Sequence, residues 1–316
     1  MKNIGVIIEL NNGKIKEINF GMITLARAKG RELFGFVINA DTAAVKDELE
    51  SYGITQIVAV SLAPDQQNNP VVRAKSIIKC IKEFNICTLL GLSTPAGKDL
   101  LPRVAAFLEA PLVMDCFSID LKQNLARTSR HSGKTIATIK ISGDIVVFGV
   151  RPKAVEPVEA WSSSQIVQFD GSNIVSEDFK LIKRVVDDKK TEISLAEADV
   201  IIAGGRGMKN GDNFSILSKC AEKLNGAVGA SRVAVDSGWV PYSMQVGLTG
   251  EKVSPRVYIA CGISGSIQHF AGMKTSTLII TINTDNNASL MADCDYFIQA
   301  DVLEIIPELT RHLEND

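Results

Sequence analysis

Residues 257–269 read VYIACGISGSIQH, and this stretch decides the fold of the second half of the chain. Its apolar start, Val257–Ala260, predicts a buried strand, and a helix is expected after the glycines and serines. A strand that ends this way is typical of a parallel α/β sheet, which binds ligands at the carboxyl ends of its strands. Ser264 and Ser266 are therefore candidate phosphate ligands. His269, just inside the predicted helix, is either a functional histidine or a packed core residue.

Three further strand-end loops in the same half have this character. After Val200–Ala203 comes Gly204-Gly205-Arg206-Gly207, in which Arg206 can reach a pyrophosphate. The spacing is not Gly-x-Gly-x-x-Gly, so a tight turn explains this loop equally well. A second loop carries Ser231 and Arg232 after two small residues, and the run QVGLTG follows at 245–250. In the last loop Asn283 follows the predicted strand Leu278–Ile282, and its amide can form hydrogen bonds with the edge of an adenine.

The first hundred residues alternate short apolar runs with amphipathic segments, which predicts a parallel sheet covered by helices. Thr94-Pro95 fits an N-cap followed by proline at the first helical position, and the helix should run toward Leu108. The predicted strands are Ile4–Ile8, Leu33–Ile38, Gln56–Val60 and Thr88–Leu92, and the predicted helices are Met22–Lys29, Thr42–Ser51 and Val71–Phe84.

The middle of the chain has a different pattern. Short alternating runs at Ser118–Leu121, Thr135–Lys140 and Ile145–Val150 predict an antiparallel extension of the first sheet. A polar stretch then continues to about Ala198, and its run Asp187–Lys190 is interpreted as a solvated linker or a helix end. Because the α/β alternation restarts near Asp199, we expect two α/β domains, 1–187 and 188–316.

Composition excludes several classes of protein. A formal net charge of −2 without a basic stripe argues against nucleic-acid binding. No apolar stretch is long enough to span a bilayer, and the first ten residues lack the features of a signal peptide, so a cytoplasmic location is expected. The six cysteines are scattered without Cys-x-x-Cys spacing, so we expect neither a disulfide framework nor a metal site. Redox chemistry would therefore need an organic cofactor.

Taken together, these loops resemble the α subunit of electron-transferring flavoproteins. The segments that carry the resemblance are AGGRG at 203–207, VGASR at 228–232, QVG and TG at 245–250, and above all the run from Tyr258 to Met273. The resemblance is strong from Val200 to His312 and faint in the first domain. It implies a flavodoxin-like C-terminal domain that holds FAD in an extended pose. It also implies an N-terminal domain that packs on a β subunit, which makes a heterodimer.

The resemblance also implies a set of FAD-binding residues. Arg232 would lie over the isoalloxazine, Thr249 would approach N5, and His269 would face the N1–C2=O edge, where a donor stabilises the charge of the reduced flavin. Leu248 departs from the family, in which glutamine is common, so the flavin potential can differ. The implied site residues are Arg206, Ser231, Arg232, Val246, Gly247, Leu248, Thr249, Ser264, Gly265, Ser266, Ile267, Gln268, His269, Asn283, Asp301 and Val302.

The same resemblance implies an electron carrier rather than an enzyme that converts a substrate. Its donors would be flavin dehydrogenases of the acyl-CoA dehydrogenase type, as in fatty acid β-oxidation, and its acceptor a quinone reductase or another redox protein. Other interpretations stay open. The chain can be a subunit of an electron-bifurcating flavoprotein that oxidises NADH, a stand-alone nicotinamide-dependent oxidoreductase, or a nucleotide-binding sensor without redox activity.

Overall fold

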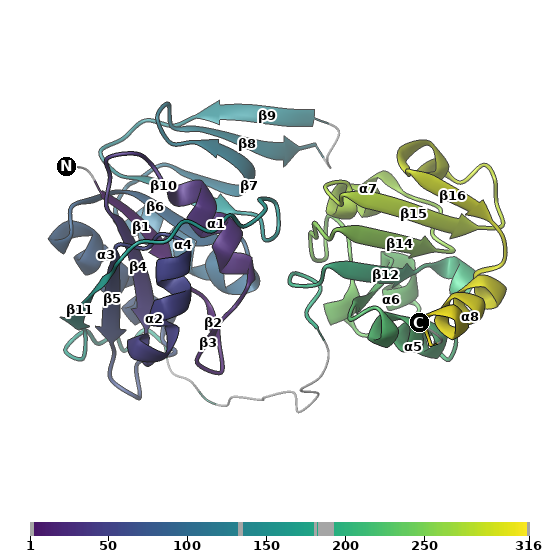
Figure 1. Ribbon diagram of the computed structural model, residues 1–316, viewed down its shortest axis with the longest axis horizontal. Coiled ribbons are helices and arrows are strands. Elements are labelled where there is room, and N and C mark those ends of the chain that lie inside the picture. Colours follow the sequence, from purple (N-terminus) through teal and green to yellow (C-terminus); the bar gives the residue numbers. More distant parts are fainter. Residues whose placement is uncertain (1–2, 132–134, 180–181, 183–192, 315–316) are drawn as a thin grey trace. The chain divides into compact units, whose positions relative to one another are not determined.

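A computed structural model describes residues 3–131, 135–179, 182 and 193–314 (Figure 1). These residues form two compact α/β units, built mainly from 3–179 and from 193–314. The predicted two-domain α/β architecture is therefore confirmed. The charged run Asp187–Lys190 and the boundary predicted at 187/188 lie outside the described residues.

Within the described residues, the first unit contains a nine-stranded sheet in the order β11-β5-β4-β1-β6-β10-β7-β8-β9. The strands from β11 to β7 pair in parallel, as the short apolar runs predict. A small hairpin, β2 (Leu10–Asn11) and β3 (Lys14–Ile15), follows β1. The strands are β1 (Asn3–Ile7), β4 (Leu33–Ile38), β5 (Gln56–Ser61), β6 (Ile86–Leu92), β7 (Leu112–Asp120), β8 (Leu125–Arg130), β9 (Thr135–Lys140), β10 (Val146–Val150) and β11 (Gln165–Asp170).

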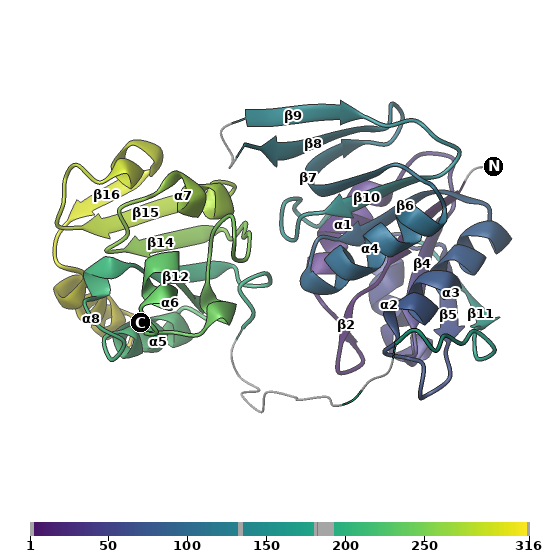
Figure 2. The same ribbon diagram turned by 180° about the vertical axis from the view of Figure 1, so that it is seen from behind.

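Four helices cover this sheet, two on each face, and an apolar core fills each interface (Figures 1 and 2). Helices α1 (Ile18–Ala26) and α2 (Thr42–Ser51) pack on one face, and α3 (Pro70–Glu83) and α4 (Pro95–Phe107) on the other. The N-cap predicted at Thr94 is present, because its hydroxyl accepts a hydrogen bond of 3.1 Å from the backbone N–H of Gly97.

The predicted antiparallel extension is present in part. β8 pairs antiparallel with β7, but β10 lies between β6 and β7 and is parallel to both. The prediction was therefore wrong for Ile145–Val150. The physical reason lies in its composition, because all five residues of β10 are buried, as expected for a strand covered by helices on both faces.

The start of the polar stretch that follows is hydrogen-bonded to the first unit. Ser162 donates its backbone N–H to the carbonyl of Glu50 over 2.9 Å, and the Ser164 hydroxyl donates to the Glu50 carboxylate over 2.9 Å. These bonds attach Ser162 and Ser164 to the last turn of α2. The next residue, Gln165, begins β11, an edge strand parallel to β5. Because β11 is mostly exposed, its sequence lacks the apolar run that marks the inner strands.

The second unit is a five-stranded parallel sheet in the order β13-β12-β14-β15-β16. This order corresponds to 2-1-3-4-5 and confirms the flavodoxin-like prediction. Helices α5, α6 and α8 pack on one face and α7 on the other. The elements are β12 (Val200–Gly204), β13 (Ala227–Ala230), β14 (Val257–Cys261), β15 (Leu278–Asn283), β16 (Tyr296–Gln299), α5 (Phe214–Lys223), α6 (Arg232–Asp236), α7 (Ile267–Met273) and α8 (Val302–Leu313).

A buried ion pair joins β7 to the end of β10. Arg151, whose side chain is 1% exposed, donates from Nε and Nη2 to the two carboxylate oxygens of Asp115 over 2.7 and 2.9 Å. Asp115 has a φ of 61°, a conformation that aspartate and asparagine tolerate better than most residues. Its backbone N–H also donates to the hydroxyl of Ser93, which follows β6, so the pair holds the inserted strand in place.

Replacing Asp115 by asparagine is expected to destabilise the protein by about 3 kcal/mol, because it removes the charged carboxylate that accepts two hydrogen bonds from the buried guanidinium of Arg151. Chemical denaturation followed by circular dichroism measures this loss. The matched control is Asp99→Asn, which breaks the exposed pair between Asp99 and Arg103 and should cost below about 1 kcal/mol. Equal losses in the two variants would contradict a structural role for the buried pair.

Candidate functional site

The predicted site residues follow the carboxyl ends of the second sheet. Because its strands are parallel, these ends all lie along one edge. The central strands β12 and β14 are neighbours, yet the chain leaves them toward opposite sides of the sheet. A switch point of this kind is where open α/β sheets bind ligands.

Backbone-to-backbone packing joins the two loops at the switch point. Gly205 donates to the carbonyl of Cys261 over 2.9 Å, and Gly207 donates to the carbonyl of Gly262 over 3.0 Å. A Cβ atom on Gly207 would lie 2.6 Å from the Cα of Gly262, a distance that real side chains do not reach. Glycine is therefore required here for the loops to touch, while the neighbouring Arg206 side chain is left exposed.

The loop between β14 and α7 is fixed in the same way. Gly265 has a φ of 83°, and a Cβ atom there would lie 2.5 Å from the Cβ of Leu290. Ser266 caps α7, because its hydroxyl accepts a 3.3 Å hydrogen bond from the backbone N–H of His269. Four residues of this loop and of the first helical turn are exposed, namely Ser264, Ser266, Ile267 and Gln268.

Residues 245–251 form a turn beside the carboxyl end of β13. Val246 donates its N–H to the carbonyl of Ala230, and Leu248 donates to the carbonyl of Gln268, each over 2.9 Å. Gly247 makes close backbone contact with α7, since a Cβ atom on Gly272 would lie 2.5 Å from the Cα of Gly247. The turn is thus held between β13 and α7.

This turn presents Thr249 at the surface in one orientation. The buried amide of Gln245 donates to the Thr249 hydroxyl oxygen over 3.0 Å, and the Tyr242 hydroxyl donates to the Thr249 carbonyl. With its oxygen engaged as an acceptor, the threonine hydroxyl keeps its hydrogen for a further partner. Gln245 and Tyr242 were not predicted as site residues. Gln245 belongs to the QVG segment that carries the family resemblance, but its contact with Thr249 could not be predicted from the sequence.

His269 is buried, with 5% of its surface exposed. Its Nε2 lies 3.0 Å from the hydroxyl of Tyr258, and its Nδ1 is shielded from solvent without a hydrogen-bond partner. Burial lowers the pKa of His269 from 6.5 to about 4, although the backbone of Val246 opposes this shift. The ring is therefore neutral at pH 7. Tyr258, which lies on β14 and is fully buried, was not predicted as a site residue.

Ser231 and Arg232 lie at the carboxyl end of β13. The backbone N–H of Ser231 donates to the carbonyl of Gly204 over 2.9 Å, and its buried hydroxyl caps α6. Arg232 is 67% exposed and contacts Asp236 of the same helix over 3.2 Å. An exposed pair of this kind contributes about 1 kcal/mol or less, so the guanidinium can leave it to contact a ligand.

The remaining predicted residues lie at the ends of β15 and β16. Asn283 donates its amide to the carbonyl of Ile263 over 3.1 Å, which ties β15 to the loop after β14. Asp301 caps α8 and pairs with Lys209 over 3.1 Å, and the Leu303 N–H and Lys209 lower the pKa of Asp301. Val302 is buried in the core, so only its backbone can face the edge.

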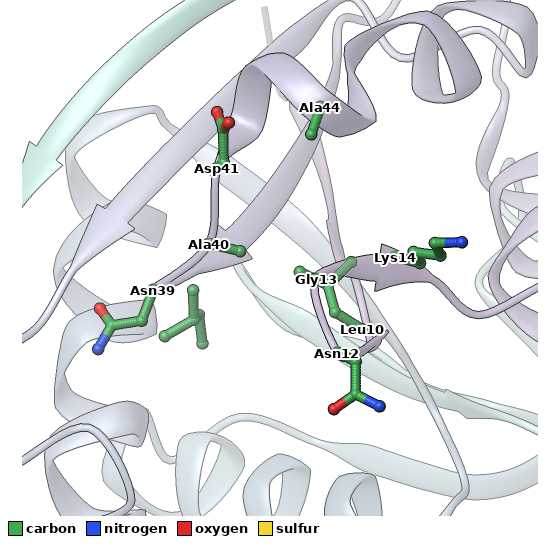
Figure 3. Close-up of a pocket in the computed structure, with 9 residues that line it drawn as sticks. Leu10, Asn12, Gly13, Lys14, Asn39, Ala40, Asp41 and Ala44 are labelled. Atoms are coloured by element: carbon green, nitrogen blue, oxygen red, sulfur yellow. The ribbon is translucent and has the colours of Figure 1, made fainter. Parts of the chain in front are cut away.

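A pocket of about 470 Å³ lies in the first unit, between the β2–β3 hairpin and the loop after β4 (Figure 3). Two of its polar side chains, those of Asn39 and Asp41, have structural partners. Asn39 accepts from the Leu62 N–H over 2.6 Å, and Asp41 caps α2. Figure 3 shows the side chain of Lys14 pointing away from both residues. None of the predicted site residues lies in this pocket.

No helix in the described part of the chain combines the length and the apolarity that crossing a bilayer requires. Among the same residues, no group of three or more histidine, cysteine, aspartate or glutamate side chains is placed to hold a metal ion.

Known proteins are similar to this chain over nearly its whole length. Residues 4–173 match the family described as "Electron transfer flavoprotein domain", and residues 194–274 match "Electron transfer flavoprotein FAD-binding domain". The electron transfer flavoprotein subunit alpha of Pseudomonas aeruginosa is 35% identical, over 97% of this chain and 98% of its own length. The corresponding probable mitochondrial subunit of Caenorhabditis elegans is 34% identical, over 98% and 92%. That of Syntrophomonas wolfei is 30% identical, over 99% and 100%.

Acidification is expected to destabilise the second unit through His269. The folded ring stays neutral down to its pKa of about 4, whereas the unfolded ring takes up a proton near its ordinary pKa of 6.5. This contribution to stability is complete above pH 6.5 and is lost as the pH falls toward 4, by up to about 3 kcal/mol. Denaturation curves between about pH 7 and about pH 4.5 measure the slope.

In His269→Gln the free energy of unfolding should fall less steeply over the same pH range, because the titrating group is gone. His312→Gln is the matched control, since His312 is exposed at the end of α8 and should leave the slope unchanged. A His269→Gln slope equal to that of the unmodified protein would contradict the neutral, buried state of this ring.

Proposed function

This chain belongs to the family of electron transfer flavoprotein α subunits, and on that premise we propose that it is the FAD-holding large subunit of a heterodimeric electron carrier. It takes electrons from flavin dehydrogenases of the acyl-CoA dehydrogenase type, as in fatty acid β-oxidation. It passes them to a quinone reductase or another redox acceptor. The observation that carries this proposal is the convergence of five strand-end loops on one sheet edge, within an FAD-binding domain.

FAD is the cofactor of the second unit, and the residues at its carboxyl edge fit this molecule. Leu248 and Ile267 are 39% and 48% exposed, and they offer apolar surface to a flat ring system. Exposed hydroxyls at Ser264 and Ser266 stand beside them and suit phosphate. His269 contributes a buried nitrogen, Nδ1, that has no partner in hydrogen-bond geometry among the described residues, as expected where a ligand completes the site. When bound, FAD supplies the one- and two-electron chemistry of the site.

We assign three residues to the flavin ring, and the structure supports each assignment. Thr249 approaches N5 with a hydroxyl whose oxygen is already engaged by Gln245. Arg232 lies over the isoalloxazine, which its weak surface ion pair with Asp236 allows. His269 faces the N1–C2=O edge, where a neutral imidazole donates a hydrogen bond and stabilises the negative charge that reduction places there.

The other assigned residues bind the rest of the extended cofactor. Exposed Arg206 and the backbone and hydroxyl groups of the loop before α7 suit the pyrophosphate, because they combine charge with free donors. Asn283 retains one N–H for the adenine edge, since its other amide contacts are within the fold. Asp301 and the backbone of Val302 lie beside the adenosine. The remaining assigned residues maintain the backbone conformation of the loops at the carboxyl edge of the sheet, namely Ser231, Val246, Gly247, Gly265 and Gln268.

The partner in this proposal is an electron transfer flavoprotein β subunit, which packs on residues 1–187 while residues 188–316 hold FAD. The names of the similar proteins specify one subunit of an assembly, which supports a second chain. A cytoplasmic location is part of the proposal. It is supported by six cysteines that are all free thiols, as expected in a reducing compartment.

Co-expression with the candidate β subunit tests this function. The purified complex should carry one FAD per heterodimer, as measured by its visible absorbance against protein concentration. An acyl-CoA dehydrogenase with its substrate should reduce that FAD, whereas NADH should not. Two FADs, one of them reduced by NADH, would replace the simple carrier by a bifurcating complex. A colourless complex that takes up no added FAD would contradict the flavoprotein function altogether.

Gly207→Ala is expected to lower the affinity for FAD at least about tenfold, because the added methyl would contact the Gly262 backbone and separate the loops after β12 and β14. FAD titration of the deflavinated complex measures the affinity. Gly211→Ala is the matched control, since its Cβ would lie 3.1 Å from the nearest atom and outside the switch point. Unchanged FAD affinity in Gly207→Ala would show that the loop contact does not shape the site.

A further inference from the structure

Tyr258 is the largest buried polar side chain close to His269, and it comes from the strand beneath the site. It is fully buried on β14, within the apolar cluster that packs against α7. Burial raises the pKa of Tyr258 well above its usual value, so the hydroxyl keeps its proton. Among the described residues the only hydrogen-bond partner of that hydroxyl is Nε2 of His269, at 3.0 Å. The Tyr258 hydroxyl and Nε2 of His269 are therefore hydrogen-bond partners of each other.

Two arrangements of protons satisfy the contact, and they are not equivalent. In the first, Tyr258 donates to Nε2 and the imidazole carries its hydrogen on Nδ1. In the second, Nε2 carries the hydrogen and donates to the phenol oxygen, which leaves the tyrosine O–H buried without an acceptor. The phenol, with an ordinary pKa of about 10, is the better donor, and the imidazole nitrogen, with an ordinary pKa of about 6.5, is the better acceptor. The first arrangement is favoured on both counts.

The first arrangement also makes Nδ1 of His269 a hydrogen-bond donor. Among the described residues no group lies within hydrogen-bond geometry of Nδ1, and the Val246 backbone, which raises the pKa of His269, is the acceptor that the fold itself offers to the ring. The N1–C2=O edge of a flavin consists of acceptors. A hydrogen on Nδ1 would be attracted to that edge, whereas a bare nitrogen lone pair would be repelled, most strongly once the flavin is reduced. Burial keeps the ring neutral at pH 7, so its contribution in that state depends on which nitrogen holds the hydrogen.

We propose that Tyr258 is a positioning residue, which donates to Nε2 of His269, fixes the hydrogen on Nδ1 and so makes this nitrogen the donor toward the flavin. This inference rests on the proposed function, because it takes from there the orientation of His269 toward the N1–C2=O edge. Tyr258 itself touches no reacting atom. It acts by selecting one tautomer and by holding the plane of the ring.

Long-range ¹H–¹⁵N correlation spectra of the complex, with ¹⁵N-histidine in this chain, identify the protonated nitrogen directly. The His269 signal is assigned by its loss in His269→Gln. The proposal expects hydrogen on Nδ1 in the holo complex and in the complex stripped of FAD. Hydrogen on Nε2 in both would overturn it. This measurement requires no variant of Tyr258, so it tests the tautomer of His269 even if such a variant fails to fold.

Tyr258→Phe removes the hydroxyl and keeps the ring that fills the core. The ratio of the two His269 tautomers should shift about tenfold toward Nε2–H, the effect expected for one buried hydrogen bond. The first reduction potential of the flavin should fall, with the bound FAD retained. Tyr296→Phe is the matched control, because Tyr296 is 63% exposed on the edge strand β16 and should change neither quantity.

Unchanged tautomer ratio and potential in Tyr258→Phe would leave Tyr258 with a packing role only and would overturn the proposal. Failure of the proposed function has a different signature, which is a wild-type complex that binds no FAD. The tautomer of His269 can still be read in that protein. The two failures are therefore distinguishable.

Discussion

Close contact between glycine backbones is the constraint on which the second unit depends. Gly207 meets Gly262 where β12 and β14 end, and Gly247 meets Gly272 where the 245–251 turn lies against α7. A side chain at these positions would separate segments that are distant in sequence. The contacts bring Arg206, Thr249 and the first turn of α7 to one edge, although each belongs to a different loop. The glycines allow the loops at this edge to pack closely, and the few polar residues between them are the groups that can contact a ligand.

The position of the candidate site was largely predictable, because most of its residues lie in short continuous segments at the ends of strands. Strand ends followed by glycine and hydroxyl residues marked the loops after β12 and β14, and parallel strands place such loops at one edge. The pattern missed Tyr258 and Gln245, which contact His269 and Thr249 of the candidate site. Tyr258 reads as one more apolar strand residue, and its partner is identified only once α7 is folded over β14. Gln245 likewise shows its role only through the contact with Thr249.

The fold was predictable where strands are buried on both faces and less so at the edges. The inner strands of the first sheet are continuous apolar runs, but β11 and β16 are mostly exposed, and β13 is built from small residues that resemble a turn. The insertion of β10 between β6 and β7 was predicted wrongly, because local alternation carries no information about which strands become neighbours. Its buried apolar composition, together with the Arg151–Asp115 pair, explains the observed place.

The central claim is that FAD occupies the carboxyl edge of the second sheet. Hydrogen–deuterium exchange of the complex, with and without FAD, tests this claim most directly, because backbone amides near the cofactor become protected when it binds. Protection should concentrate in five segments, 204–209, 229–232, 245–251, 262–269 and 283–285. Protection concentrated instead around the first-unit pocket, between the β2–β3 hairpin and the loop after β4, would contradict the account.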